Sequence, residues 1–438
     1  MLETATHISK LAATSPVQKS KGRAIDGKYS HNDRVSLAVK SRVGSRYVLF
    51  TDISRFYHSI YTHSIPWALH TKAKAKTNKK FTLLGNKLDF LIRQGQDGQT
   101  IGIPIGPDTS LVLAELIMNK CDESLLTKSS SVKGHRFIDD YELSFKTRTE
   151  AEEAFHQLET CLSDYELALN PKKTKVIELP SALESNWVRE LKNFSFRSSV
   201  KSQAYDLEDY FSYVFEISKA NKDEPVLQFA IARLRSVTIH SNNWDLFQRL
   251  ILLCIAPEPA TLPYALEQII SRINLGMPPL SNEIQDVLKS LIETHAPLKH
   301  SSEVANALWG CLVLQLKITG KSVDLFSQCD DSCIALLALD CRSKGLLTKT
   351  LDTTLWESFM NASGLYDEHW LLAYEANYKG WLPNPGGIDF VATDVNFSYL
   401  KANGVYFYDE SLTSSRDDNQ VPMPTIPSSF IPTSYQSF

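Results

Sequence analysis

The sequence predicts an α+β module over about residues 1–185, followed by an all-α region over about residues 190–410. Short β-prone runs alternate with helical stretches in the first part, whereas only helical stretches recur from about residue 205 onward. Residues 1–93 hold 17 Lys and Arg against 5 Asp and Glu, while the rest of the chain carries a net charge of −16. A length of 438 residues is also too large for one hydrophobic core.

The composition excludes several classes of protein. Apolar residues make up 43% of the chain and charged residues 22%, which is typical of a soluble globular protein rather than a collagen-like or disordered one. No run approaches the ~18 consecutive apolar residues of a membrane span, and the start MLETATHISK lacks a signal-peptide pattern. The seven Cys form no C-x-x-C pair, which favours reduced thiols. We therefore expect a cytoplasmic protein with no membrane partner.

Hydrophobic periodicity assigns the elements of the first module in chain order. Residues 46–57, RYVLFTDISRFY, begin with a short strand that ends at Asp52. The next expected elements are the start of a helix at 60–70, an amphipathic helix at 81–93, a helix from Ser110 to Leu126, two strands meeting at a tight acidic turn at 135–145, a helix at 149–167 and strand-like residues at 168–178. Thr149 and Glu152 have the spacing of a capping box for the helix at 149–167.

Recurrent helices separated by Pro and Gly are typical of the second region. They are expected at residues 225–236, 244–256, 263–274, 283–294, 302–317 and 331–340. A period near ~40 residues predicts stacked helical pairs of the HEAT-like type. Residues 411–438 are rich in Ser, Thr and Pro, so we expect a disordered tail there.

Acidic residues lie at the expected strand ends. Asp52 follows the apolar run YVLF, and Asp139 and Asp140 lie between RFI and YELSF. In a small sheet, one carboxylate at a strand end and two on an adjacent hairpin can converge. Three such carboxylates would hold Mg²⁺, a hard cation that prefers oxygen ligands, and two ions about 4 Å apart support phosphoryl transfer. The alternative interpretation is that each Asp is a turn or cap residue.

Four short motifs occur in a characteristic order from Asp52 onward. They are DISRFY at residues 52–57, GIPIGPDTS at 102–110, FIDD at 137–140 and LNPKKTK at 169–175. Their order and spacing resemble motifs A, B, C and D of the reverse transcriptase palm over residues 46–179. The stretches DISRFYHSIYTHSIPWALHTK, GQTIGIPIGPDTSLVLAE and HWLLAYEANYKGWL are similar to bacterial abortive-infection (Abi) reverse transcriptases. Core packing of aromatic residues at helical spacing is the alternative explanation for the last stretch.

This resemblance implies a fold, an activity and a set of partners. The fold is an α+β reverse-transcriptase palm, an antiparallel sheet with helices and partial fingers, followed by an all-α HEAT-like repeat domain. The activity is that of a DNA polymerase, a nucleotidyltransferase, in antiphage abortive-infection defence. Some family members work without a template and start on a protein hydroxyl. The implied partners are deoxynucleoside triphosphates, the DNA product, RNA for a templated enzyme, and further copies of the chain in a homo-oligomer.

The resemblance also assigns the metal ligands. Asp52, Asp139 and Asp140 correspond to the family's catalytic carboxylates, and the backbone carbonyl of Ile53 is an extra ligand. The implied cofactor is a pair of Mg²⁺ ions, with Mn²⁺ as a substitute.

Five further residues are implied at the nucleotide. Tyr57 would stack under the sugar and exclude a 2′-hydroxyl, and Arg55 would contact the triphosphate. Lys173 would neutralise or protonate the leaving pyrophosphate, while Gly106 and Ser110 belong to the nucleotide-binding turn. The corresponding structural alternatives are a core aromatic for Tyr57, solvated charges for Arg55 and Lys173, and the N-cap of the following helix for Ser110.

Two departures from the family pattern leave other functions open. Pro104-Ile105-Gly106 replaces the usual Pro-Gln-Gly, as in the Abi relatives, and Ile offers no polar contact to a nascent pair. Only 51 residues precede Asp52, so we expect shortened fingers and an incomplete triphosphate clamp. The alternatives are a catalytically weak scaffold whose helical repeat binds a phage or host factor, and a templated RNA-directed DNA polymerase. No residue is singled out as the priming hydroxyl, although Tyr29 and Tyr61 lie near the palm in sequence.

Overall fold

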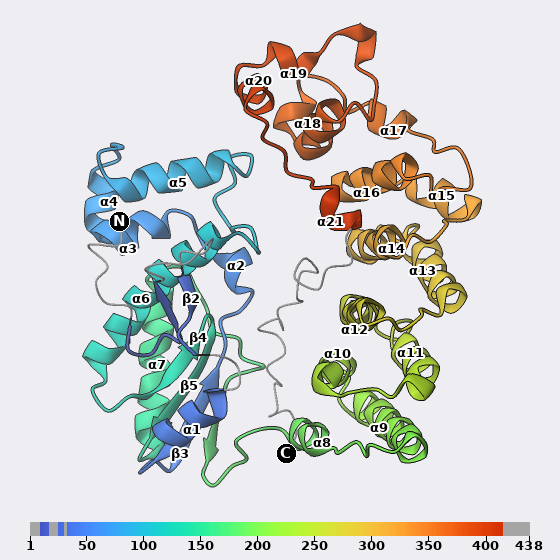
Figure 1. The fold of residues 1–438 in the computed structure, drawn as a ribbon. Coiled ribbons are helices and arrows are strands. Elements are labelled where there is room, and N and C mark those ends of the chain that lie inside the picture. Colours follow the sequence, from blue (N-terminus) through green and yellow to red (C-terminus); the bar gives the residue numbers. More distant parts are fainter. Residues whose placement is uncertain (1–8, 17–24, 30–32, 415–438) are drawn as a thin grey trace. The chain divides into compact units, whose positions relative to one another are not determined.

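The computed structural model describes residues 9–16, 25–29 and 33–414 (Figure 1). The contacts between residues divide the described chain into two compact units, with the boundary between Asn186 and Trp187. Each unit has its own buried apolar cluster.

A four-stranded antiparallel sheet forms the centre of the first unit. Its order is β4-β5-β3-β6, so β3 lies between β5 and β6. The strands are β3 (Tyr47–Thr51), β4 (Lys133–Phe137), β5 (Asp140–Phe145) and β6 (Lys175–Glu178). A smaller sheet pairs β1 (Thr14–Pro16) with β2 (Ile25–Gly27). The expected strand before Asp52 and the expected hairpin at 135–145 are therefore present.

Helices cover both faces of the larger sheet. Leu49, Leu143 and Phe145 face the apolar cluster that includes residues of α6 and α7. Ser144 points to the opposite face, because side chains alternate along a strand, and there it lies against Ser41 of α1. The helices of this unit are α1 (Arg34–Arg42), α2 (Phe56–Ser59), α3 (Ser64–His70), α4 (Lys72–Thr77), α5 (Leu84–Gln94), α6 (Asp108–Lys128) and α7 (Arg148–Ser163).

Two helix starts differ from the sequence prediction. The capping box of α7 is formed by Thr147 and Glu150, rather than by Thr149 and Glu152. Both spacings satisfy the motif, and the structure selects the earlier one because the strand β5 ends at Phe145 and leaves Thr147 extended. Helix α6 begins at Asp108 with Pro107 as its N-cap, so Ser110 is not the cap.

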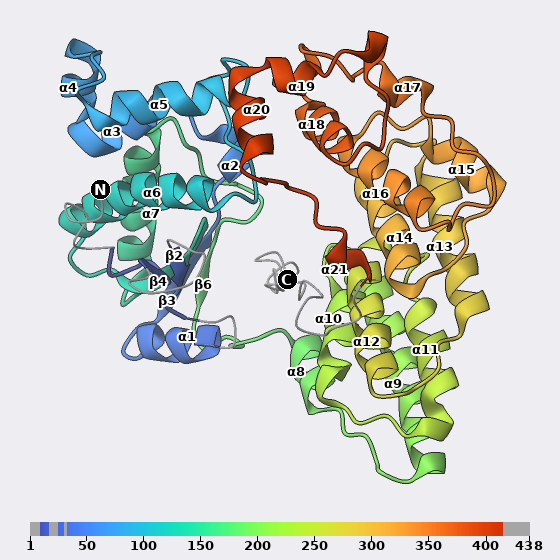
Figure 2. The ribbon, with the colours of Figure 1, turned by 45° about the horizontal axis from the view of Figure 1, so that its top comes forward.

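The second unit is built from helices alone within the residues described. Successive helices pack side by side along the unit, as α9 against α10 and α13 against α14 (Figures 1 and 2). The helices are α8 (Asn186–Asn193), α9 (Val200–Ala220), α10 (Val226–Arg233), α11 (Trp244–Leu252), α12 (Leu262–Asn274), α13 (Ser281–His295), α14 (Ser301–Leu314), α15 (Gly320–Phe326), α16 (Ser332–Ser343), α17 (Thr354–Glu357), α18 (Trp370–Tyr378), α19 (Phe390–Thr393), α20 (Val395–Ala402) and α21 (Ser411–Ser414).

The helices in this unit depart from the sequence prediction in several places, and α15, α17, α19 and α20 lie outside the predicted ranges. The long helix α9 was not expected, although its buried residues follow a helical period. The stretch predicted at 225–236 is an α-helix only to Arg233, and it then tightens into a 3₁₀ turn over Leu234–Ser236. The expected disordered tail began at Ser411, but Ser411–Ser414 are helical; residues 415–438 lie outside the described part of the chain.

Among the described residues, no helix is long and apolar enough to cross a membrane. All seven cysteines are free thiols, and only Cys333 is exposed.

Candidate active site

The ends of two neighbouring strands bring the predicted carboxylates together. Asp52 directly follows β3, Asp139 lies in the turn between β4 and β5, and Asp140 begins β5. Because β3 and β5 are antiparallel and Thr51 is paired with Tyr141, the end of β3 meets the start of β5. Asp52 lies close enough to Asp139 for its charge to raise the pKa of Asp139. The structure therefore brings these three residues to one edge of the sheet. Their carboxylate oxygens do not all lie within 4.8 Å of one another.

Burial and mutual repulsion change the protonation of this cluster. Burial, together with the charges of Asp140 and Asp52, raises the pKa of Asp139 to about 7. Burial also raises the pKa of Asp140, although the Arg34 guanidinium opposes that shift. A divalent cation would relieve the same repulsion, and carboxylate oxygens are its preferred ligands. The donor set therefore fits a hard divalent cation.

Lys173 contacts the first of the carboxylates. Its Nζ lies 2.7 Å from Oδ2 of Asp52, which is only 6% exposed. Burial lowers the pKa of Lys173, but the hydrogen bond and charge of Asp52 outweigh it, so the net shift is upward. The turn that carries Lys173 is attached to the same strand end, because the backbone N–H of Asn170 donates to the backbone carbonyl of Asp52 at 2.7 Å.

Arg34 was not predicted as a site residue, yet it contacts the third carboxylate. Its Nη2 lies 3.4 Å from Oδ2 of Asp140, and its guanidinium lies 4.2 Å from the centre of the Phe137 ring. Burial lowers the pKa of Arg34, and the charge of Asp140 opposes the shift. The only sequence signal for this residue is its place in a basic segment, which does not indicate its partner.

A buried ionic network lies behind the acidic turn and was also missed from the sequence. Arg136 on β4 is fully buried and forms bonds of 3.0–3.1 Å with both carboxylate oxygens of Glu115. Its Nε donates to Asp122 at 3.0 Å, and the Tyr141 hydroxyl donates to the same carboxylate at 2.6 Å. Arg136 Nη1 also donates to the carbonyl of Ile138 at 2.6 Å. The network thus ties the turn residue before Asp139 to helix α6.

The turn itself has an uncommon backbone. Phe137 pairs with Asp140, so the hairpin loop consists of Ile138 and Asp139 alone. Ile138 has a φ of 58°, which is unfavourable for a β-branched residue. Two-residue hairpins need positive φ in their loop, and Gly or Asn is the usual solution. The bond from Arg136 to the Ile138 carbonyl therefore helps to hold a conformation that the residue itself disfavours.

Tyr57 lies close enough to the carboxylates for the charge of Asp139 to act on its hydroxyl. Ile53 directly follows Asp52 in the chain. Burial raises the pKa of Tyr57 to about 12, with contributions from the charges of Asp139 and Glu115. Ile53 is buried and bridges to Leu169, next to the turn that carries Lys173. The roles that the resemblance implied for both residues stay predictions.

The three other nucleotide-binding candidates are less closely connected to the carboxylates. Arg55 is exposed and has a φ of 48°. Gly106 lies in an exposed turn with a φ of 112°, and Ser110 is buried in the first turn of α6. Within the described part of the chain, these residues form no hydrogen bond or ion pair with the three carboxylates.

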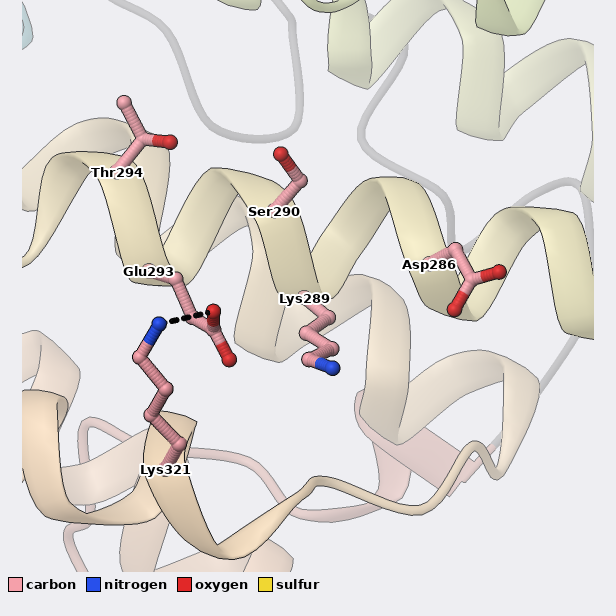
Figure 3. Close-up of a pocket in the computed structure, with 6 residues that line it drawn as sticks. All are labelled: Asp286, Lys289, Ser290, Glu293, Thr294 and Lys321. Atoms are coloured by element: carbon pink, nitrogen blue, oxygen red, sulfur yellow. Dashed lines mark hydrogen bonds and ion pairs between the residues drawn. The ribbon is translucent and has the colours of Figure 1, made fainter.

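A polar recess lies on the second unit, between α13 and α15 (Figure 3). It measures about 380 Å³ and is lined by Asp286, Lys289, Ser290, Glu293, Thr294 and Lys321. Glu293 and Lys321 form an ion pair of 2.8 Å across it. Acidic and basic side chains both line the recess, so its charge favours neither an anionic nor a cationic ligand.

Comparison with known families agrees with the arrangement in the first unit. Residues 5–203 match the family described as reverse transcriptase (RNA-dependent DNA polymerase). Residues 5–203 are therefore similar to a reverse transcriptase domain. The match includes Asp52, Asp139, Asp140 and Lys173, and it indicates an RNA-directed DNA polymerase, a nucleotidyltransferase. Reverse transcriptase domains generally use divalent metal ions. No curated protein matches the chain.

Proposed function

We propose that the reverse transcriptase domain is a Mg²⁺-dependent DNA polymerase whose metal ligands are Asp52, Asp139 and Asp140. The observation that carries this proposal is the convergence of three carboxylates, one of which holds its proton up to about pH 7. Such a cluster is stable as three anions only beside a cation. We propose two Mg²⁺ ions, with Mn²⁺ as a substitute and the Ile53 carbonyl as an extra ligand.

The proposed chemistry is attack by a 3′-hydroxyl, or by a protein hydroxyl, on the α-phosphate of a deoxynucleoside triphosphate. The bound metal ions would activate the attacking hydroxyl and stabilise the leaving oxygen. Lys173, which pairs with Asp52, would neutralise or protonate the pyrophosphate as it leaves. Tyr57, whose hydroxyl is influenced by Asp139, would lie under the sugar and exclude a 2′-hydroxyl. Arg55, Gly106 and Ser110 are proposed to contact the nucleotide.

We further propose an Abi-type enzyme that extends a protein primer without a template, in antiphage defence. The support is the resemblance of three sequence stretches together with Ile105 in the motif B turn. That side chain is 63% exposed and offers no hydrogen bond to a nascent base pair. The helical second unit is interpreted as HEAT-like, and homo-oligomerisation stays a prediction.

A polymerisation assay on the purified full chain tests this proposal. Labelled deoxynucleotides and Mg²⁺ are supplied with and without an RNA template, and products are separated under denaturing conditions. The Asp139→Asn, Asp140→Asn variant should abolish incorporation. Asp97→Asn makes the same chemical change at an exposed residue of the same unit and should leave it intact.

The outcomes separate the alternatives. Label retained on the protein without template supports the protein-primed reaction. Incorporation only with template retains the polymerase but replaces the template-free proposal with a conventional RNA-directed one. If neither condition yields incorporation, the polymerase proposal fails and the scaffold alternative takes its place.

A further inference from the structure

A second cluster of metal-ligating side chains lies in the helical unit, on elements that carry none of the proposed catalytic residues. His295 ends α13, His300 is the N-cap of α14, and Glu303 lies in the first turn of α14. One ligand atom from each residue lies within 4.8 Å of the other two. All three come from a single nine-residue segment, which the sequence analysis did not single out.

The two imidazoles face each other through their Nδ1 atoms. Their Nδ1 atoms are 2.9 Å apart, and the ring centres are separated by 5.2 Å. Zinc binds imidazole nitrogen at about 2.0–2.1 Å, so two nitrogens on one ion lie at most about 4.2 Å apart. The observed separation satisfies that limit, and a Glu303 carboxylate oxygen lies within 4.8 Å of a ring nitrogen of each histidine.

The backbone keeps this pair together. The His300 amide donates to the His295 carbonyl at 3.1 Å, and the Leu298 amide donates to the same oxygen at 3.1 Å. Lys299 takes a φ of 57° to close the turn, and the Val304 amide then donates to His300 at 3.3 Å. Because the turn is closed by these bonds, little conformational freedom remains to be lost when an ion binds.

A hydrogen bond between the two rings is the competing explanation. In that arrangement one Nδ1 carries a proton and the other accepts it, and the contact needs no third residue. A metal ion would instead bind both Nδ1 atoms and a carboxylate oxygen of Glu303. The last carbonyls of α13, near His295, also favour positive charge.

We propose that His295, His300 and Glu303 bind one divalent transition-metal ion, such as Zn²⁺ or Ni²⁺, and thereby tie the end of α13 to the start of α14. Imidazole suits these borderline metals, whereas an all-carboxylate cluster suits Mg²⁺ and Mn²⁺. The two sites therefore differ in the class of ion that they select. His300 is exposed, so a water molecule would complete the coordination.

Calorimetric titration of the full chain with NiCl₂ tests this site, after removal of any purification tag. Millimolar Mg²⁺ is present throughout to occupy the carboxylate cluster. We expect one Ni²⁺ per chain, and His300→Ala should weaken Ni²⁺ binding by at least about tenfold. Mutation of residues that only hydrogen-bond to a metal ligand already lowers metal affinity by that much. His300 is exposed, so its removal leaves the core of the unit unchanged.

The chain offers a matched control. His156 and Glu159 also form an imidazole–carboxylate pair, with 3.4 Å between Nδ1 and Oε2. Among the described residues, this pair belongs to no group of three ligating side chains. His156→Ala should leave Ni²⁺ binding unchanged. Ni²⁺ should raise the thermal midpoint of the parent protein and of His156→Ala. This rise should be lost in His300→Ala. The absence of saturable binding, or binding that survives both His300→Ala and His295→Ala, would overturn the proposal.

Discussion

Replacing Arg136 with methionine should strongly destabilise the hairpin that carries Asp139 and Asp140. Methionine keeps much of the side-chain length but removes the charge from a fully buried position. Glu115 and Asp122, whose side chains are 5% and 0% exposed, would then be left without their cation. Removing one member of a buried ion pair costs about 3–5 kcal/mol, because a buried charge is left uncompensated.

Hydrogen exchange followed by mass spectrometry is the appropriate measurement, because it reports on the hairpin separately from the helical unit. The peptide that contains β4 and β5 should lose about 3–5 kcal/mol of protection in Arg136→Met. Arg46→Met is the matched control, since Arg46 pairs with Glu178 at the surface, with side chains 68% and 52% exposed. Protection in this variant should stay close to that of the parent protein.

A rescue experiment separates charge from packing. In the variant that combines Arg136→Met with Glu115→Gln and Asp122→Asn, no buried charge of the network remains, so most of the lost protection should return. Unchanged protection in Arg136→Met alone would refute the argument. Equal loss in the single and triple variants would show that packing, rather than uncompensated charge, sets the cost.

Three further predictions concern the acidic turn and the nucleotide. Because burial and the neighbouring carboxylates raise the pKa of Asp139 from 3.8 to about 7, the metal-free folded protein binds a proton that the unfolded chain lacks in this window. Its stability should therefore fall as the pH rises from about 4 to 7, which thermal unfolding at several pH values measures; a flat profile would contradict the assigned shift. In Gly134→Ala, the new Cβ would lie 2.1 Å from the Glu142 carbonyl oxygen at a φ of 152°, so chemical unfolding should show a loss of more than about 1 kcal/mol. Tyr57→Val should increase ribonucleotide incorporation relative to deoxynucleotide incorporation, and an unchanged ratio in a competition assay would remove Tyr57 from the sugar site.

Some features of this protein follow from local sequence, and these were predictable. An apolar run before Asp52 predicts a strand, and two short runs around an acidic pair predict a hairpin, because strand patterns and turn chemistry depend on neighbouring residues. Helix starts were less predictable. Thr147 and Thr149 are both followed three residues later by Glu, and only the end of β5 decides between them.

The contacts around the site required the tertiary structure. Arg34 lies 106 residues before its partner Asp140, and no local pattern links the two. Arg136 lies two residues before the turn of Ile138 and Asp139, yet its burial against Glu115 and Asp122 depends on how α6 packs on the sheet. The sequence by itself predicted the three carboxylates as candidate ligands and determined the order in which they occur. Folding decided which charges meet and lose water, because desolvation and ion pairing depend on distance in space rather than along the chain.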